Sequence, residues 1–181
     1  MNKAIFLDRD GTLNEDEGYV HKVEDYKLLP GVIEALRMLK DKFLFFIITN
    51  QSGVGRGYYK LEDVHKFNEV MLEEFKQEGI KIEEIFICPH HPDKDCGCRK
   101  PNEKFIRQAE KEHNVDLKKS YMIGDHGHDV ELGLNVGAKG IYLLTGHGEK
   151  HFHKIKVKPD LIAKDLLEAA KWIIKNEQKQ D

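Results

Sequence analysis

The sequence predicts an α/β protein in which a parallel β-sheet carries helices on both faces. Short apolar runs of strand length alternate along the chain with longer segments that repeat apolar residues at helical spacing. Strands alternating with helices in this way are typical of parallel sheets. Polar residues also gather directly after the apolar runs, at the strand ends where such sheets bind ligands.

The predicted strands are short aliphatic and aromatic runs that end at acids, amides, cysteine or glycine. Residues 4–8 show the pattern, because a buried apolar run ends in an aspartate and a glycine-containing turn follows. Residues 43–49 are rich in Phe and Ile and stop at Asn50. The predicted strands span residues 4–8, 43–49, 82–87, 120–123 and 140–144.

The predicted helices repeat apolar residues every three or four positions and have recognisable ends. Pro30 and Gly31 precede the first helix, and Gly79 follows the longest one. Residues 145–159 are polar and rich in His and Lys, so we expect a mobile loop there. The predicted helices span residues 32–40, 61–77, 102–113, 130–136 and 165–175.

The composition favours one folded domain over residues 1–181, because 40% of the residues are hydrophobic and can form a core. The longest apolar run, residues 43–48, is far shorter than the ~20 residues of a membrane span, and no signal peptide is expected. A net charge of −3 argues against a nucleic-acid partner. Three clustered cysteines do not form a disulfide scaffold. We therefore expect a soluble cytoplasmic protein without a membrane partner.

Asp8 and Asp10 leave the first predicted strand two positions apart. Both carboxylates can face an open crevice there and hold a hard cation such as Mg²⁺ through oxygen. Gly11 lets the chain turn sharply around a ligand. A solvated acidic turn is the alternative. An EF-hand is excluded, because the glycine stands at the fourth position of the segment rather than the sixth.

The segment from Thr49 to Ser52 offers a hydroxyl and loop amides that suit phosphate oxygens. An ordinary turn after a strand is the alternative interpretation. Gly53, Gly55 and Gly57 follow, but they lack the later glycine of a dinucleotide-binding fingerprint. No Walker-type sequence occurs either, which disfavours a kinase that uses nucleoside triphosphates.

All three cysteines lie in residues 88–98 together with His90 and His91. Soft thiolate and imidazole donors at this density match a tetrahedral Zn²⁺ site. Three thiolates and one imidazole leave no open position, so such a zinc ion is structural. The spacing does not decide between His90 and His91, and reduced surface thiols are the alternative.

Arg99 and Lys100 follow the last cysteine directly. A lysine held beside a phosphate neutralises developing charge, and an arginine can clamp a second anionic or polar group. The alternative is a solvated basic pair, which would be the default if no zinc loop held these residues in place.

Three further features lie toward the C-terminus. Asp125 follows a buried strand, and we expect it to be the third protein ligand of the cation. Asp129 is expected to cap the following helix, which is the commoner role for such a residue. His147, His151 and His153 allow a second metal site, but their irregular spacing favours a solvated surface.

Together these segments resemble the haloacid dehalogenase (HAD) superfamily, and within it the zinc-containing D-glycero-D-manno-heptose 1,7-bisphosphate phosphatases and the related histidinol-phosphate phosphatases. The resemblance spans residues 3–146 with the motifs in the family's order, and the heptose enzymes are the closer likeness through residues 17–21 and 56–57. The motifs are Phe6-Leu-Asp8-Arg-Asp10-Gly-Thr12, Thr49-Asn50-Gln51-Ser52-Gly53, Cys88-Pro-His90-His91-Pro92, Cys96-Gly-Cys98-Arg99-Lys100-Pro101 and Gly124-Asp125.

The resemblance implies an HAD-like, three-layer phosphatase that forms an aspartyl-phosphate intermediate. Asp8 is the implied nucleophile, and Asp10 the acid that protonates the leaving sugar oxygen and then the base that activates water. The implied Mg²⁺ ligands are an Asp8 oxygen, the Asp10 backbone carbonyl and Asp125. Thr49 and Lys100 are expected to hold the transferring phosphoryl oxygens.

The resemblance also implies a structural Zn²⁺ that fixes the loop of residues 88–100, which presents Arg99 and Lys100. The implied substrate is a small phosphorylated sugar bound by a monomeric enzyme. The implied zinc ligands are Cys88, His90, Cys96 and Cys98. The expected substrate contacts are Asp16, Glu17, Gly18, Tyr19, Thr49, Asn50, Gln51, Ser52, Arg99, Lys100 and His126.

No connection is long enough for a cap domain, so we expect an open site whose substrate choice rests on short loops. His126 stands where the heptose enzymes usually carry lysine, and a histidine there can still donate to a sugar hydroxyl or a phosphate. One alternative is a phosphatase for another small phosphomonoester, such as histidinol phosphate. The other is a non-catalytic, zinc-stabilised module that binds phosphorylated ligands, which the presence of Asp8 and Asp10 disfavours.

Overall fold

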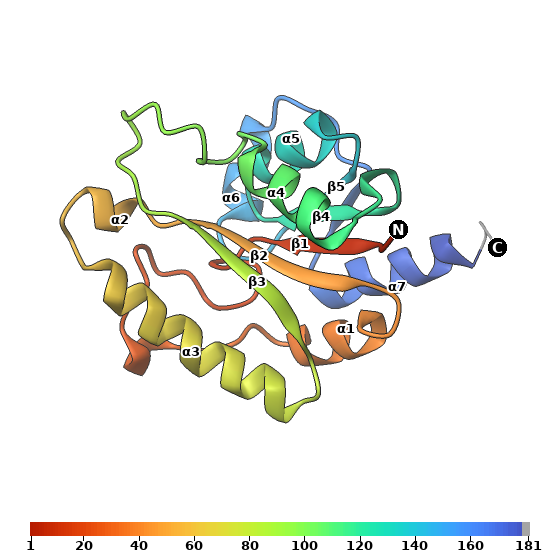
Figure 1. Ribbon diagram of the computed structural model, residues 1–181, viewed down its shortest axis with the longest axis horizontal. Helices are drawn as coiled ribbons and strands as arrows, with labels where there is room; N and C mark the ends of the chain where they lie inside the picture. The colour runs from red at the N-terminus through yellow and green to blue at the C-terminus, as the bar shows by residue number, and fades with distance from the viewer. Residues whose placement is uncertain (179–181) are drawn as a thin grey trace.

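A computed structural model describes residues 1–178 and confirms the expected α/β fold (Figure 1). One six-stranded parallel sheet has the order β3-β2-β1-β4-β5-β6. The strand β1 lies between β2 and β4 in the middle of this sheet, and its side chains are therefore buried on both faces. The strands are β1 (Ala4–Leu7), β2 (Leu44–Asn50), β3 (Ile82–Cys88), β4 (Tyr121–Gly124), β5 (Lys139–Leu143) and β6 (Leu161–Ala163).

Helices connect the strands and agree closely with the periodicity of the sequence. The predicted helix over residues 61–77 is observed over the same residues, and the other four predicted helices differ only at their ends. The α-helices are α1 (Val32–Leu39), α2 (Ser52–Gly55), α3 (Leu61–Gln77), α4 (Lys104–His113), α5 (Gly127–Asn135), α6 (Gly148–His151) and α7 (Leu166–Glu177). The 3₁₀-helices are η1 (Val23–Asp25), η2 (Leu117–Lys119) and η3 (Phe152–Lys154).

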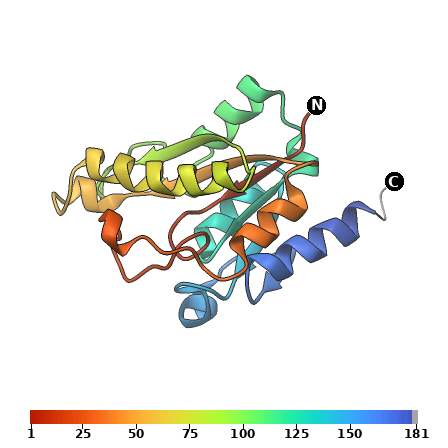
Figure 2. The same cartoon turned by 90° about the horizontal axis from the view of Figure 1, so that it is seen from below.

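The sheet separates two hydrophobic cores, which gives the molecule three layers. Successive side chains of a strand point to opposite faces. Ile5 and Leu7 therefore belong to the core under α1, α3 and α7, which Figure 2 shows in front of the sheet. Ala4 and Phe6 belong to the core under α4 and α5. No separate cap domain covers the strand ends within the described residues, as expected.

The region of residues 145–159 is not the simple loop that the sequence suggests. It contains the one-turn helix α6 and the 3₁₀-helix η3. Gly148 packs so closely on the end of β5 that an added Cβ would lie 1.9 Å from the Leu143 carbonyl oxygen. Tyr142 also donates a hydrogen bond of 2.8 Å to the Gly148 carbonyl. A single helical turn has no apolar period, so the sequence pattern could not predict it.

The short edge strand β6 was also not predicted, because its three residues lie between two polar segments. It pairs with β5, and Leu143 lies opposite Ala163 in the register. No helix in residues 1–178 is both long and apolar enough to cross a membrane.

Candidate active site

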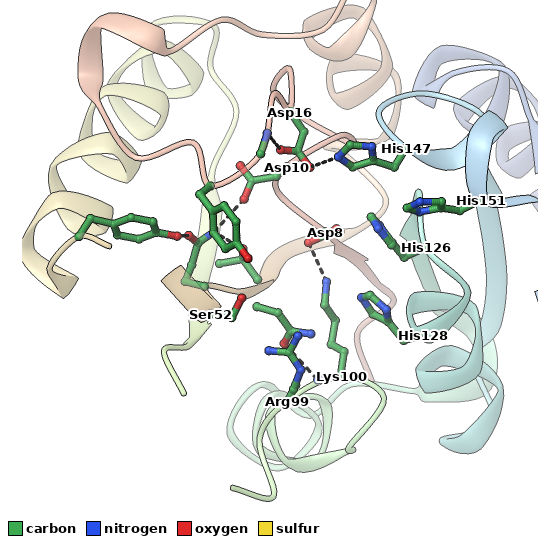
Figure 3. A pocket seen from close by; sticks show the side chains of 16 residues that line it. Asp8, Asp10, Asp16, Ser52, Arg99, Lys100, His126, His128, His147 and His151 are labelled. Carbon is green, nitrogen blue, oxygen red and sulfur yellow. Dashed lines mark hydrogen bonds and ion pairs between the residues drawn. The ribbon is translucent and has the colours of Figure 1, made fainter. Parts of the chain in front are cut away.

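A cavity of about 340 Å³ opens where the carboxyl ends of the strands meet (Figure 3). It brings together almost all residues expected to contact substrate. Glu17 is the exception, because it is exposed and lines a neighbouring depression instead. The residues that line the cavity are Asp8, Asp10, Asp16, Gly18, Tyr19, Thr49, Asn50, Gln51, Ser52, Tyr59, Arg99, Lys100, His126, His128, His147 and His151.

Lys100 bridges two carboxylates at the floor of this cavity. Its Nζ atom lies 2.7 Å from Asp8 Oδ1 and 2.8 Å from Asp129 Oδ1, and it donates to the Ile48 carbonyl at 2.8 Å. Burial opposes the charge, but the two carboxylates outweigh it and raise the pKa of Lys100. A buried ammonium ion needs such partners. The strand ends and the loop before α4 therefore meet at a fixed ion-pair network.

Asp129 has a wider role than the sequence predicts. Its Oδ2 accepts a hydrogen bond of 3.1 Å from the His126 N–H, so it caps α5 from the third position of the helix, whereas from the sequence we expected it to precede a helix that begins at residue 130. Its Oδ1 faces Lys100, which sequence reasoning missed. Burial opposes ionisation, yet the charge of Lys100 lowers the pKa of Asp129 below its usual value. The only hint in the sequence is its position one helical turn after Asp125.

The environment of Asp8 is crowded with negative charge. Burial raises the pKa of Asp8 to about 8, and the carboxylates of Asp129 and Asp125 add to this, while Lys100 opposes it. Asp8, Asp125, Asp129 and His126 each offer a ligand atom within 4.8 Å of one another. Carboxylate oxygens are the donors that Mg²⁺ prefers, and a divalent cation would relieve this repulsion. The residues present therefore fit a magnesium ion.

Asp10 is held by Arg9, a residue that the sequence did not single out. The guanidinium forms two bonds to the Asp10 carboxylate, from Nε to Oδ1 at 2.9 Å and from Nη2 to Oδ2 at 3.0 Å. It also donates to Asn68 and to the Val20 carbonyl, and it lies 4.4 Å above the Phe67 ring. Arg9 is fully buried. An arginine inside an acidic turn looks like a surface residue in sequence, so nothing local could reveal this pair.

A chain of hydrogen bonds joins Asp10 to the predicted phosphate-binding segment. Gln51 Nε2 donates to Asp10 Oδ2 and to Thr49 Oγ1, each at 2.8 Å. The Tyr59 hydroxyl in turn donates to Gln51 Oε1 at 2.8 Å. Asp10 Oδ2 therefore accepts hydrogen bonds from both Arg9 and Gln51. Tyr59 was not predicted, because it reaches the cavity from the loop between α2 and α3.

Asp125 is fully buried and is enclosed by glycines. A Cβ on Gly11 or Gly146 would lie 2.3 or 2.4 Å from Asp125 Oδ2, and both residues have positive φ angles. The His147 N–H donates to the same oxygen at 2.8 Å, and His126 Nδ1 lies 2.7 Å from Oδ1. The turn after β1 and the loop after β5 therefore both pack directly on this carboxylate.

Four histidines line one side of the cavity, which partly corrects the expectation of a solvated surface. His147 and His151 reach the cavity because α6 packs over the end of β5, whereas His153 is exposed outside it. Burial opposes the charge on His126, but the bond to Asp125 raises the pKa of His126 to about 9. Burial, with the nearby charges of Lys100 and His126, lowers the pKa of His128 to about 4.

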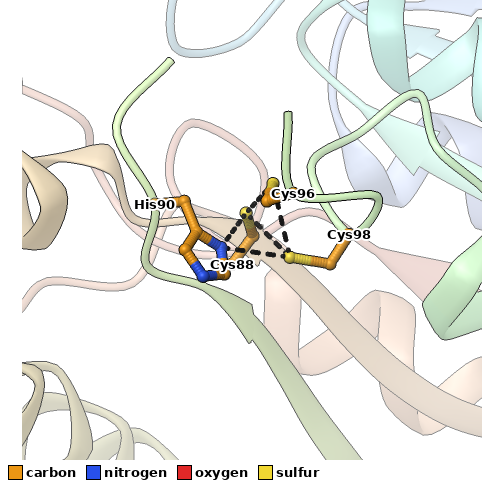
Figure 4. Close-up of side chains that lie close together, drawn as sticks. All are labelled: Cys88, His90, Cys96 and Cys98. Atoms are coloured by element: carbon orange, nitrogen blue, oxygen red, sulfur yellow. Dashed lines mark hydrogen bonds between the residues drawn. The ribbon is translucent and has the colours of Figure 1, made fainter. Parts of the chain in front are cut away.

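Three sulfur atoms and one imidazole converge beside the cavity (Figure 4). The Sγ atom of Cys98 lies 3.2 Å from that of Cys88 and 3.6 Å from that of Cys96, and His90 Nδ1 lies 3.3 Å from Cys98 Sγ. Ligands of one tetrahedral zinc ion lie about 3.5–3.8 Å apart, so the four atoms fit such an ion. His91 instead lies 3.4 Å from Asp93.

The backbone of this loop favours the thiolate form of Cys96. Burial opposes ionisation of Cys96, but the N–H groups of Cys98 and Arg99 outweigh it and lower the pKa of Cys96 to about 6. Arg99 and Lys100 leave the loop toward the cavity, and the Lys100 N–H donates to Asn50 Oδ1 at 3.1 Å. The sulfur cluster thus sits where it can hold the basic pair against β2.

Known proteins resemble this chain over nearly its whole length. A family model described as HAD-hydrolase-like matches residues 97–169. D-glycero-beta-D-manno-heptose-1,7-bisphosphate 7-phosphatase of Helicobacter pylori is 41% identical over 174 residues, which covers 95% of this chain and 97% of the relative. The D-glycero-alpha-D-manno-heptose-1,7-bisphosphate 7-phosphatase of Campylobacter jejuni is 46% identical over 144 residues, covering 79% of this chain and 83% of the relative.

A solved structure has the same fold. The D,D-heptose 1,7-bisphosphate phosphatase of B. bronchiseptica, complexed with magnesium and phosphate, superposes with a TM-score of 0.89 at 29% identity. The match covers 96% of this chain and 99% of that one.

Proposed function

Because the chain belongs to the D-glycero-D-manno-heptose-1,7-bisphosphate 7-phosphatase family of HAD-like hydrolases, we propose that it removes the 7-phosphate of this bisphosphate. It is a phosphoric monoester hydrolase, and its substrate is a phosphorylated sugar. One observation carries the proposal. Asp8, Asp10 and Lys100 come from three separate segments and line one cavity at the carboxyl ends of the strands.

In the proposed reaction Asp8 attacks the phosphorus atom, and the bond from phosphorus to the sugar oxygen breaks. Asp10 gives its proton to that leaving oxygen and later takes a proton from the water that hydrolyses the aspartyl-phosphate. Arg9 and Gln51 both donate hydrogen bonds to the Asp10 carboxylate, which fixes its position at the cavity. Asp10 can therefore serve both steps without moving.

Lys100 and Thr49 would hold the phosphoryl oxygens during transfer. Lys100 Nζ already lies 2.7 Å from Asp8 Oδ1, so its charge sits next to the atom that attacks. A bound Mg²⁺ would neutralise the repulsion between the Asp8 carboxylate and the phosphate. The proposed magnesium ligands are Asp8, Asp125 and the Asp10 backbone carbonyl, and the crystallised relative from B. bronchiseptica contains magnesium.

We further propose that Cys88, His90, Cys96 and Cys98 bind a structural Zn²⁺. The convergence of their donor atoms supports this, since all four lie within 4.8 Å of one another. With zinc bound, the loop of residues 88–100 would hold Arg99 and Lys100 in the cavity. This loop and the sheet would then form one domain over residues 1–181.

Substrate choice would rest on the loops around the cavity, since no cap domain covers it within residues 1–178. Asp16, Gly18, Tyr19 and His126 line the same cavity as the proposed phosphate-binding groups. The relatives named above carry different anomers in their names, beta in Helicobacter pylori and alpha in Campylobacter jejuni. Both anomers therefore belong in the test.

The test is phosphate release with Mg²⁺ present, comparing both anomers of the heptose bisphosphate with histidinol phosphate. We expect kcat/KM for the heptose substrate to be higher by about a hundredfold or more, the discrimination that a few loop contacts can supply. Equal or greater activity on histidinol phosphate would contradict the proposed substrate. Absence of phosphate release from all three compounds would contradict the phosphatase mechanism itself.

A further inference from the structure

The histidines on one side of the cavity form a feature that the proposed phosphatase chemistry does not use. The ring centroids of His147 and His151 lie 5.4 Å apart, and the His126 centroid lies 5.9 and 5.5 Å from them. We call these three residues the histidine cluster. Figure 3 shows them together on the side of the cavity away from Arg99 and Ser52.

These separations match those of imidazoles that share one metal ion. With a Zn–N distance of about 2.0–2.1 Å and tetrahedral angles, the ring centroids of two histidines on one ion lie about 5 Å apart. His147 and His151 are also four positions apart across α6, so their side chains share one face of that turn. Two histidines at this spacing on a helix are a recurrent zinc-binding arrangement.

Neighbouring carboxylates leave a free ring nitrogen on two members of the cluster. His126 Nδ1 lies 2.7 Å from Asp125 Oδ1, which leaves its Nε2 for a ligand. His147 Nε2 lies 3.3 Å from Asp16 Oδ2, which leaves its Nδ1. Carboxylates that hold the second nitrogen of a histidine orient metal-bound imidazoles in many proteins. The ring nitrogens of the three residues do not all lie within 4.8 Å of one another, so the side chains would have to move closer together on binding a metal ion.

We propose that His126, His147 and His151 form a second transition-metal site, separate from the sulfur cluster of the zinc loop. Imidazole donors select Zn²⁺, Ni²⁺ or Cu²⁺ over Mg²⁺, which prefers oxygen. Three imidazoles leave a fourth coordination position for water or a phosphate oxygen. His128 lies next to His126, with ring centroids 5.1 Å apart, and is a neighbour of the site rather than one of its three proposed ligands.

The decisive measurement is the zinc content of the full chain after dialysis against Zn²⁺, comparing the unmutated protein with His147→Ala/His151→Ala. We expect the unmutated protein to hold one more zinc ion per chain than the double variant. The backbone N–H of His147, which bonds to Asp125, is retained in that variant. His153→Ala is the matched control, because His153 lies in the same segment but is exposed and does not line the cavity.

A spectroscopic measurement identifies the ligands. Cu²⁺ added to zinc-loaded protein should give an electron paramagnetic resonance spectrum with nitrogen hyperfine splitting, and the double variant should lose it. Equal zinc content in the unmutated protein and the double variant would overturn the proposal. So would an equal loss in His153→Ala. A raised KM for the bisphosphate with unchanged metal content would also overturn it, and would assign the cluster to the substrate's second phosphate.

The metal measurements need no substrate, so their outcome does not depend on the proposed phosphatase activity. The site adjoins the catalytic cavity. We therefore expect excess Zn²⁺ to inhibit phosphate release by the unmutated protein, an expectation that rests on the proposed function. The double variant should resist this inhibition.

Discussion

Three carboxylates and one ammonium group share a buried space at the centre of the site. Lys100 contacts Asp8 and Asp129, and Asp125 adds further negative charge. Such a network is stable only when every member is paired, because an isolated buried charge costs several kcal/mol. Because the three carboxylates lie close together and repel one another, the site favours binding of a divalent cation.

Asp8→Asn should abolish turnover while leaving the chain folded. The amide has the same shape as the carboxyl group but cannot attack phosphorus, and it removes one of the crowded carboxylates. Phosphate-release assays and circular dichroism on the same preparation check both parts. Substantial residual turnover would show that Asp8 is not the nucleophile.

The stability of the magnesium-free protein should fall as the pH rises. The folded-state pKa of Asp8 is about 8, above the value of 3.8 expected in the unfolded chain, so the folded protein binds the proton more tightly. That contribution is complete below about pH 4 and is lost progressively toward about pH 8. The lowered pKa of His128 opposes this contribution between about pH 4 and pH 6.5, so the net fall is expected above pH 6.5, where the raised pKa of His126 adds to it.

Thermal unfolding across this pH range, with and without Mg²⁺, measures the effect. Mg²⁺ binds the ionised carboxylate, so its stabilisation should grow as the pH rises. Asp8→Asn should flatten the dependence. A magnesium-free protein that became more stable between about pH 6.5 and pH 8 would contradict the assignment.

Arg9→Met should destabilise the fold and impair catalysis together. The substitution keeps an apolar stem of similar length but leaves Asp10, Asn68 and the Val20 carbonyl without their buried partner. Removal of one member of a buried pair costs about 3–5 kcal/mol. Urea unfolding measures this free energy. Arg107→Met is the control, since Arg107 pairs with Glu103 and Glu110 on an exposed face, and it should change stability by less than about 1 kcal/mol.

At the scale of elements, short loops between strands and helices do most of the positioning. The loop of residues 88–100 brings Arg99 and Lys100 to the cavity, and α2 packs against it. A Cβ on Gly55 would lie 2.1 Å from the His91 backbone nitrogen, so the two segments touch along their backbones. The helix α6 likewise brings His147 and His151 to the cavity, at the end of β5.

Cys96→Ser should lower zinc content and thermal stability together. The serine hydroxyl is a poor zinc ligand, so the loop loses the ion that holds its thiols and His90 in place. Metal analysis and thermal unfolding of the same samples check the prediction. A loss of stability without a loss of zinc, or an unmutated protein free of zinc, would contradict the proposed zinc site.

At the scale of the whole molecule, one parallel sheet contributes side chains to both hydrophobic cores. The core under α1, α3 and α7 extends from Phe75 on one side to Ile173 on the other. Elements far apart in the chain pack together, as α1 does with α7. A continuous core of this kind predicts one cooperative unfolding unit.

The single tryptophan, Trp172, tests that cooperativity because it lies in α7, in a different part of the chain from the zinc loop. Unfolding followed by Trp172 fluorescence should coincide with unfolding followed by loss of phosphatase activity. Ile173→Ala should shift both transitions equally, at a cost of about 2–5 kcal/mol. Ile162→Ala, at a partly exposed position, is the control. Separate transitions would contradict a single domain.

Local patterns were enough to predict five strands, five helices and the main chemical groups. Period and length specify an element, and the rule that ligands lie at the carboxyl ends of parallel strands places Asp8, Thr49 and Asp125 near one another. The density of cysteine around His90 likewise indicates a metal cluster. These features depend on neighbours in the sequence, so the sequence reveals them.

Contacts across the fold decided the rest. The burial of Arg9 against Asn68 and Phe67, the bridge from Lys100 to Asp129 and the meeting of His126 with His147 all join segments that lie far apart in the chain. In sequence each of these residues has the ordinary alternative of a solvated side chain or a helix cap. Burial removes that alternative, because a charge withdrawn from water must find a partner in the fold.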